Sequence, residues 1–417
     1  MGKSRQIFEK IDTVRSSRNG RIIVLTGARQ VGKTTIVREW MKDYQYISIE
    51  DPVTRETYKS LTSDQWHSLY PAAALDEVQK VPEIIESIKA AYDKYQDVRY
   101  VLLGSSQLLL LNKVKESLAG RCTIFDIYPL TLPEIATRSW NDNAVRSVWQ
   151  ESLANGFTGH GIYPSFLIDP RHVEKQSAWD YYMKFGGYPA LLDETFSDDD
   201  RYLWLRNYVR TYLERDVRDL ASFRDLAPFV KLQREVCSLS GQVLNASSIS
   251  KDLNISSKTV QRYINYLELS YQEIVLPSWS RNESKRLAKA PKLHSMDFGV
   301  QQAVLGKHGG MTGHEFESAI VSELFKQAKN MLAEASFYHL RTADGAEVDL
   351  IVEVPDGYYA FEVKMTENVS KSDARHLKGL SSILDKKLIA SIVLSNDPVT
   401  KDLGDGITAV NAAMFLG

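Results

Sequence analysis

The residues with the clearest chemical purpose form one short run near the start of the chain, residues 27–34, which read GARQVGKT. Its two glycines let the backbone curl so that successive N–H groups face one phosphate. Lys33 would neutralise the β- and γ-phosphates of a nucleoside triphosphate, and the Thr34 hydroxyl would ligate Mg²⁺. The run therefore predicts a P-loop. Its nucleotide-binding set is Gly27, Ala28, Arg29, Gln30, Val31, Gly32, Lys33, Thr34 and Thr35.

A phosphate loop needs a strand before it and a helix after it, and the flanking residues predict both. The apolar run 22–26 precedes the loop, and residues 35–40 open a helix. Further candidate strands alternate with helical stretches, which is typical of a parallel sheet covered on both faces. These strands are expected at 46–50, 72–76, 99–104 and 123–127. The first third of the chain is therefore predicted to be an α/β P-loop NTPase domain.

A triphosphate hydrolase also needs a carboxylate at a strand end to hold its metal. Asp76 and Glu77 follow the run 72–75, so Asp76 would hold Mg²⁺ and Glu77 would polarise the attacking water. The run is rich in alanine, which favours helices over strands. The acidic pair could therefore instead begin the following helix.

Two further features could complete this site. Ser105 and Ser106 follow the strand 99–104, where a hydroxyl could sense the γ-phosphate, although a plain turn explains them as well. Arg121 could stabilise transition-state charge, within its own chain or toward a neighbouring one. The alternative is an ordinary surface arginine.

The middle of the chain contains a predicted helix, tight turn and helix over residues 246–268. Ser256 or Ser257 would cap the second helix. That helix would direct outward a face of hydrogen-bond donors that suits DNA: Ser257, Lys258, Gln261, Arg262 and Asn265. Residues 246–292 hold eight Lys or Arg and four Asp or Glu, a net of 8 − 4 = +4. The alternative is a lid or a protein-docking surface on the ATPase.

A second acidic constellation lies near the end of the chain. A strand over 345–352, a turn at 355–357 and a returning strand over 358–364 would place Asp349, Glu362 and Lys364 on one face. Glu317 borders the apolar stripe of a helix that begins near 313. Carboxylates beside a lysine suit metal-dependent phosphodiester cleavage. The alternatives are a solvated surface hairpin and a nuclease fold retained for binding alone.

Several motifs, in order, resemble one protein family. TGARQVGKTT, LDEVQK, LLGSS, and SLAGR followed by YPLTLPEI are similar to the AAA+-type ATPases of a widespread, poorly characterised prokaryotic family. GGYPALL, YVRTYLERDV and KLHSMDFGV resemble its middle-region signatures. The order Glu317, Asp349, Glu362, Lys364 resembles the PD-(D/E)xK nuclease core, which binds Mg²⁺ through its carboxylates, and there Lys364 would activate the nucleophile. The alanines before Asp76 depart from the family's bulkier aliphatic residues.

The resemblance implies an ATPase, a helical and winged-helix middle, and a C-terminal α/β domain of restriction-endonuclease type. We expect an ATPase domain over 1–140, a helical linker or lid over 141–240, a winged-helix module over 241–295 and a nuclease-like domain over 310–417. The region 141–170, rich in Gly, Asn and Pro, is expected to be a boundary. The last third should read helix, three strands, helix, strand.

Composition limits the alternatives. The 417 residues have a formal net charge of −2, so any attraction to nucleic acid must be local. Two cysteines, no apolar run of membrane-spanning length and a charged amino end suggest a cytoplasmic protein without membrane contact. The expected function is Mg²⁺-dependent ATP hydrolysis coupled to DNA binding or processing. The alternatives are a nucleotide-controlled switch acting on a protein partner, and a defence or toxin-type nuclease. Oligomeric state is not indicated.

Overall fold

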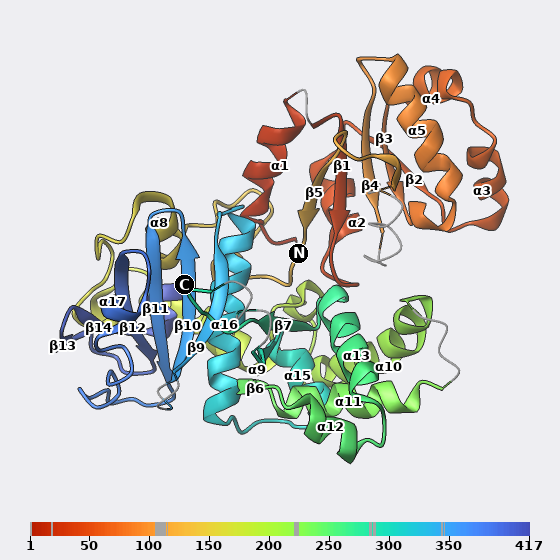
Figure 1. The fold of residues 1–417 in the computed structure, drawn as a ribbon. Coiled ribbons are helices and arrows are strands. Elements are labelled where there is room, and N and C mark those ends of the chain that lie inside the picture. The colour runs from red at the N-terminus through yellow and green to blue at the C-terminus, as the bar shows by residue number, and fades with distance from the viewer. Residues whose placement is uncertain are drawn as a thin grey trace.

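The described residues form three β-sheets, each in a different part of the chain (Figure 1). The computed structural model describes residues 2–17, 20–104, 114, 116–220, 225–282, 286, 289–342, 345 and 347–417, with side chains omitted for 212–220. The predicted residues Ser105 and Ser106 lie outside the described part of the chain.

The first sheet is parallel and has five strands in the order β2-β3-β4-β1-β5. The strands are β1 (Ile22–Thr26), β2 (Gln45–Ser48), β3 (Ala72–Asp76), β4 (Arg99–Leu103) and β5 (Thr123–Asp126). The helices are α1 (Ile7–Arg15), α2 (Lys33–Trp40), α3 (Pro52–Lys59), α4 (Ser63–Leu69), α5 (Pro82–Lys94) and α7 (Leu132–Ala136), with the short η2 (Val78–Lys80). The predicted parallel α/β architecture is confirmed. Carboxyl ends of parallel strands share one edge, so the residues after β1, β3 and β4 lie at the same edge.

One detail differs from the sequence prediction, and one predicted strand is confirmed against its alternative. The helix after the P-loop begins at Lys33 rather than at residue 35, because Gly32 caps it in a left-handed conformation. The alanine-rich run 72–76 is a strand, not the start of a helix. It lies between β2 and β4 with Ala73, Ala74 and Leu75 fully buried, so tertiary packing overrides the helical preference of alanine.

The middle of the chain is mostly helical, with a small antiparallel sheet in the order β6-β8-β7. Its elements are α8 (Val148–Asn155), η3 (Phe166–Ile168), α9 (His172–Phe185), η4 (Pro189–Leu192), α10 (Asp198–Leu220), α11 (Ala227–Ser238), β6 (Gln242–Val243), α12 (Ala246–Asp252), α13 (Ser257–Leu269), β7 (Glu273–Leu276), β8 (Lys292–Ser295) and α15 (Phe298–Leu305). The two helices predicted over 246–268 are confirmed as α12 and α13, and Ser256 caps α13 by accepting from the Thr259 N–H.

The last part of the chain forms a six-stranded mixed sheet in the order β13-β14-β12-β11-β10-β9. Its elements are α16 (Gly313–Asn330), β9 (Ser336–Arg341), β10 (Glu347–Val354), β11 (Gly357–Lys364), α17 (Leu380–Ile383), β12 (Leu388–Ser395), β13 (Lys401–Gly404), β14 (Ile407–Asn411) and α18 (Ala412–Leu416). The hairpin of β10 and β11 is confirmed. The prediction of a single final strand was wrong, because β13, β14 and a buried terminal helix follow β12.

The segment expected to be a boundary is packed into the structure. Helix α8 lies beside β11 at the left of Figure 1. The indole of Trp149 is fully buried there, donates to the Leu324 carbonyl at 2.9 Å and meets the rings of Tyr359 and Phe361 edge to face. Glycine and asparagine in this region therefore mark turns around a docked helix rather than a free linker.

The three parts share hydrophobic packing. One cluster of buried side chains runs from Leu25 of the parallel sheet through Tyr182 of α9 to Ile320 of α16 and Phe415 of α18. The parallel sheet and the C-terminal sheet are therefore connected through the helical middle.

Candidate functional site

The loop between β1 and α2 has the backbone conformation that a phosphate cradle needs. Gly27 (φ 140°), Gln30 (φ 64°) and Gly32 (φ 99°) are all in positive-φ conformations. A Cβ at Gly27 would lie 2.2 Å from the Ile127 carbonyl oxygen, so only glycine fits there. This curl, followed directly by the first turn of α2, points backbone N–H groups toward one place.

The Lys33 ammonium lies inside the loop. It is buried, and its Nζ donates to the carbonyl oxygens of Gly27 and Ala28, both at 2.7 Å. These acceptors are neutral and belong to the loop itself. A phosphate oxygen carries more charge than a carbonyl and would make the stronger hydrogen bond. The ammonium is thus held at the point where an anion can exchange for its present partners.

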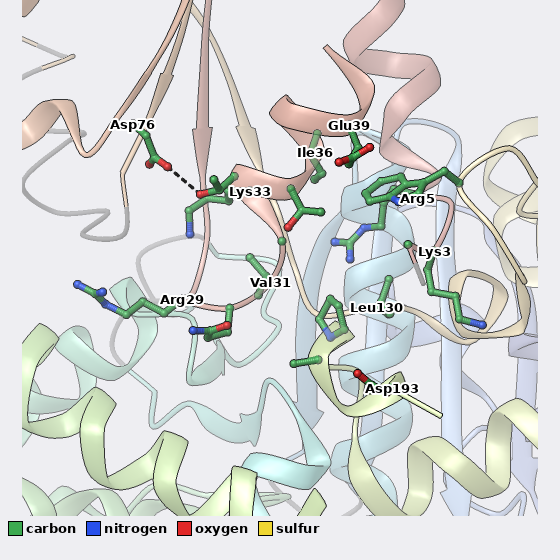
Figure 2. A pocket seen from close by; sticks show the side chains of 18 of the residues that line it. Lys3, Arg5, Arg29, Val31, Lys33, Ile36, Glu39, Asp76, Leu130 and Asp193 are labelled. Atoms are coloured by element: carbon green, nitrogen blue, oxygen red, sulfur yellow. Dashed lines mark hydrogen bonds between the residues drawn. The ribbon is translucent and has the colours of Figure 1, made fainter. Parts of the chain in front are cut away.

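Thr34 and Asp76 come together across the strand edge. Thr34 Oγ1 donates to Asp76 Oδ2 at 2.8 Å, which is the dashed contact in Figure 2. A hydroxyl beside a carboxylate at a P-loop is the donor set that suits an octahedral Mg²⁺ with water ligands. The residues present therefore fit a magnesium nucleotide.

Tyr46 holds the same carboxylate and was not anticipated from the sequence. Its hydroxyl donates to Asp76 Oδ2 at 2.7 Å, and the Arg38 guanidinium lies 4.1 Å from its ring centroid. Burial and the hydrogen bond to Asp76 raise the pKa of Tyr46 to about 12, so it remains a donor. The strand register pairs Tyr46 with Ala74, two residues before Asp76 and on the same face. The contact between Tyr46 and Asp76 follows from the register of β2 on β3, which the sequence alone does not give.

Glu77 takes an unusual backbone conformation at the end of β3. Its φ is 59°, in the left-handed region that side chains other than glycine rarely adopt. Its Oε2 accepts from the Gln79 amide at 2.8 Å. Such strain, on the order of 1–3 kcal/mol, is found most often at functional positions. Both Asp76 and Glu77 line the cavity at the loop.

That cavity has a volume of about 690 Å³, within the range of small-molecule sites. The P-loop, Asp76 and Glu77 line it, and Figure 2 shows Asp76 and Lys33 across the cavity from Lys3 and Arg5. The opposite wall comes from parts of the chain that the sequence did not indicate: Gly2, Lys3, Arg5, Trp140, Pro189, Ala190 and Asp193. Pro189 belongs to the GGYP turn and is the nearest neighbour a Cβ at Gly32 would meet, at 4.0 Å. The middle region thus completes the pocket.

Arg121 does not reach this pocket in its own chain. It precedes β5, which runs parallel to β1, so it lies at the opposite edge of the sheet from the P-loop. Its guanidinium makes a two-pronged contact with the Asp93 carboxylate, at 2.8 and 3.1 Å. Of the roles considered for Arg121, this position does not suit action on the chain's own nucleotide; action toward a neighbouring chain and an ordinary surface arginine stay open. The sequence does not give this position, because the place of a residue relative to the sheet edge depends on topology.

A buried hydroxyl cluster connects the P-loop strand to the middle module. Tyr271, the second residue after α13, shares a 2.7 Å hydrogen bond with the Thr26 hydroxyl and also donates to Asp126. Thr26 directly precedes Gly27 of the loop. Tyr271 has a φ of 59°, so its position is set by a tight turn. The end of α13 is therefore one hydrogen bond from the phosphate loop.

The outer face of α13 carries the predicted hydrogen-bond donors. Val260, Ile264 and Leu267 are buried on its inner face. The opposite face exposes Ser257, Lys258, Gln261, Arg262 and Asn265. The geometry thus leaves this surface accessible to a partner.

The C-terminal constellation is assembled, but a residue absent from the prediction lies within it. Lys364 Nζ contacts Glu362 Oε2 at 3.0 Å, and Asp349 Oδ2 accepts from the Val363 N–H at 2.9 Å. Lys292, from β8 of the middle module, extends its ammonium among the carboxylates. It lies 2.6 Å from Glu317 Oε1, 2.9 Å from Glu347 Oε1 and 3.4 Å from Asp349 Oδ1.

The electrostatics of the cluster follow from this arrangement. Burial, together with the neighbouring Asp349 charge, raises the pKa of Glu362 to about 9. Burial disfavours the charged form of Asp349, yet the Lys292 ammonium holds the pKa of Asp349 below its usual value. Within the described residues, no three His, Cys, Asp or Glu side chains are arranged to hold a metal ion. The residues as placed therefore do not fit a divalent cation here.

Comparisons with known proteins agree with the N-terminal geometry. Residues 19–136 match the family model of an AAA domain. The parallel sheet, the P-loop and this match define the region as an AAA-type P-loop domain. Residues 176–309 and 312–415 match two domains of unknown function, DUF8612 and DUF4143.

Two mycobacterial proteins resemble nearly the whole chain. They are the uncharacterized proteins Mb2031c of Mycobacterium bovis and Rv2008c of Mycobacterium tuberculosis. Each is 25% identical over 407 residues, covering 95% of this chain and 81% of its own length. The likeness therefore includes the middle and C-terminal parts as well as the P-loop domain.

Two solved structures show weaker similarity. The Walker-type ATPase PABY2304 of Pyrococcus abyssi is 15% identical with a TM-score of 0.45, covering 72% of this chain and 94% of its own. A STAND protein with a tetratricopeptide repeat sensor, PH0952 of Pyrococcus horikoshii, is 9% identical with a TM-score of 0.28, covering 76% and 45%. TM-scores of this size do not establish a shared overall fold.

In the described parts of the chain, no helix combines the length and the apolar character needed to cross a bilayer.

Proposed function

We propose that this protein binds ATP with Mg²⁺ and hydrolyses it at the cavity between the P-loop and the GGYP turn. The observation that carries the proposal is the 2.8 Å contact between Thr34 and Asp76 beside the buried Lys33 ammonium. The AAA domain match supports ATP as the nucleotide. The division into 1–140, 141–240, 241–295 and 310–417 remains our proposal for the functional units.

Each group at the cavity has a separate role in nucleotide binding or hydrolysis. Backbone N–H groups of the P-loop hold the phosphates, and Lys33 exchanges its carbonyl partners for phosphate oxygens. Thr34 and Asp76 would hold Mg²⁺, with Tyr46 fixing the orientation of the Asp76 carboxylate. Bound Mg²⁺ supplies neutralisation of the charge that develops on the phosphoryl oxygens. Glu77 orients the attacking water and accepts its proton.

The test is the Glu77→Gln variant. Removing a positioned general base should lower ATP turnover by about 10²- to 10⁴-fold while nucleotide affinity stays close to that of the unaltered protein. Glu86→Gln, an exposed glutamate on α5, is the matched control and should turn over normally. Turnover that survives in the Glu77 variant would remove Glu77 from the mechanism.

A second function, DNA contact through α13, is favoured by the exposed donor face of that helix. The succession α11, β6, α12, α13, β7, β8 has the element order of a winged helix, which supports this proposal because the second helix of such a pair enters the major groove. Several of the module's basic residues point elsewhere, however. Arg286 contacts Glu353 and Lys292 enters the acidic cluster. The outward positive charges of α13 are Lys258 and Arg262.

Duplex binding measured across a salt series separates DNA contact from the alternative of a protein-only switch. If α13 contacts phosphates, affinity should fall steeply with salt, and a Lys258→Ala/Arg262→Ala double variant should lower the slope of log K against log salt by about 2. Lys371→Ala, an exposed lysine in the C-terminal part, is the control. Affinity that is flat with salt, or equal slopes for the double variant and the control, would favour the protein-partner alternative.

We assign no cleavage step to the C-terminal cluster. The nuclease prediction required a divalent cation among Glu317, Asp349 and Glu362, and the Lys292 ammonium already contacts two of these, Glu317 and Asp349.

A further inference from the structure

The acidic cluster of the C-terminal sheet already contains a cation, and the cation is part of the protein. The Lys292 side chain is 2% exposed, and its ammonium contacts Glu317, Glu347 and Asp349 within 3.4 Å. Three carboxylates around one ammonium leave it neither hydrated nor free to rotate away. A buried cation in such a cluster takes the electrostatic role that a bound metal would otherwise have.

Lys292 enters the cluster from a fixed position. It begins β8, the central strand of the small sheet, where it pairs with Val243 on one side and Leu276 on the other. Strand β8 also packs on α16: the Ser295 N–H donates to Ser318 Oγ at 2.9 Å, and Ser240 and Ser318 share a 2.7 Å hydrogen bond. The ammonium therefore cannot leave the cluster without moving β8 relative to α16.

The contact is one of several that connect the middle module to the C-terminal domain through charge. Arg286 lies 3.4 Å from Glu353 of β10, and Arg281 donates to the carbonyls of Ile383 at 2.8 Å and Ser382 at 2.9 Å. Arg281 and Arg286 lie between β7 and β8, and Lys292 is the first residue of β8. All three contact the C-terminal domain, and of these three only Lys292 is enclosed by three carboxylates within the described residues.

We propose that Lys292 is the resident cation of this cluster: it docks the middle module on the C-terminal domain and excludes divalent metal. A metal ion and the ammonium compete for the same carboxylate oxygens, and two cations cannot share a space this small. The cluster is accordingly metal-free while β8 stays on α16. It can take a divalent ion only when the lysine side chain is removed or withdrawn. The proposal is independent of ATP hydrolysis at the P-loop.

The experiment is Mn²⁺ titration of the nucleotide-free full-length protein, followed by electron paramagnetic resonance. The unaltered protein and Asp349→Asn should give superimposable titrations. Lys292→Gln should bind about one Mn²⁺ per chain more than the unaltered protein. Its affinity for this ion should be at least ~10-fold higher than any affinity of the unaltered cluster. Adding Mn²⁺ should raise the melting temperature of Lys292→Gln and leave that of the unaltered protein unchanged. The gain should disappear in Lys292→Gln/Asp349→Asn.

Two further variants make the result decisive. Lys307→Gln removes a different lysine, which pairs with Glu315 at the start of α16, the helix that also carries Glu317. This variant should gain no Mn²⁺. Lys292→Arg keeps the positive charge and should exclude Mn²⁺ even if Lys292→Gln does not fold. Mn²⁺ bound by the unaltered protein and lost in Asp349→Asn would overturn the proposal. So would a folded Lys292→Gln that gains no ion, or Mn²⁺ binding by Lys292→Arg.

Discussion

The P-loop and the C-terminal acidic cluster each hold a buried lysine, but the two ammonium groups have different partners. Lys33 donates to two backbone carbonyls at the edge of an open cavity of about 690 Å³. Lys292 is enclosed by three carboxylates and is 2% exposed. Neutral acceptors can yield to a phosphate, whereas charged acceptors hold the ammonium more strongly. The first lysine is therefore placed to bind a ligand, and the second to replace one.

The largest expected effect on stability comes from removing Lys292, the more enclosed of the two lysines. Lys292→Met leaves a buried, uncompensated group of carboxylates, which should lower the free energy of unfolding by about 3–5 kcal/mol. Urea denaturation at neutral pH measures the change. Lys364→Met is the control: Lys364 is 34% exposed and, among the described residues, forms an ion pair with Glu362 only, so its loss should cost much less. If both variants lose the same free energy of unfolding, enclosure by three carboxylates does not add to the stabilising effect of Lys292.

Removing Lys33 should have the opposite effect: a large loss of ATP turnover with little change in stability. Lys33→Met should reduce ATP turnover by about 10²- to 10³-fold, because a positioned charge on the phosphates is lost. Its stability should change little, since the carbonyls of Gly27 and Ala28 can be hydrated at the cavity. Steady-state turnover and urea denaturation of the same sample measure both properties. A Lys33 variant that retains turnover would remove the distinction between the two lysines.

A smaller effect is expected where the P-loop strand meets the middle module. Tyr271→Phe removes the hydroxyl that bonds to Thr26 and Asp126, at a cost of about 1–3 kcal/mol because Asp126 loses a buried donor. If this contact transmits nucleotide state, ATP should also stabilise the module less, as measured by amide hydrogen exchange of α13 with and without nucleotide. Tyr266→Phe, on α13 itself, is the control. Unchanged nucleotide-dependent exchange would make Tyr271 a structural residue only.

The sequence predicted what lies in continuous stretches. The P-loop, the strand leading to Asp76, the α12 and α13 pair and the β10–β11 hairpin each depend on neighbouring residues and regular spacing. Side-chain alternation was enough to place Glu362 and Lys364 on one face. These elements therefore needed no knowledge of the tertiary fold.

The errors arose where distant segments meet. Arg121 lies at the wrong edge of the sheet, which only strand direction reveals. Tyr46 reaches Asp76 through the register of two strands 30 residues apart in the chain. Lys292 stands 57 residues before Asp349, in a motif that predicted family membership but no side-chain role. Such contacts are set by tertiary packing between segments that are distant in the chain, and this packing has no local signature.

The central claim is that the P-loop cavity takes a magnesium nucleotide. Calorimetric titration of the full-length protein with ATP and Mg²⁺ tests it most directly, with Asp76→Asn as the partner variant. We expect saturable binding at one site per chain that strengthens with Mg²⁺, and loss of that Mg²⁺ dependence in Asp76→Asn. Absence of saturable binding of any purine nucleotide in the presence of Mg²⁺ would contradict the account.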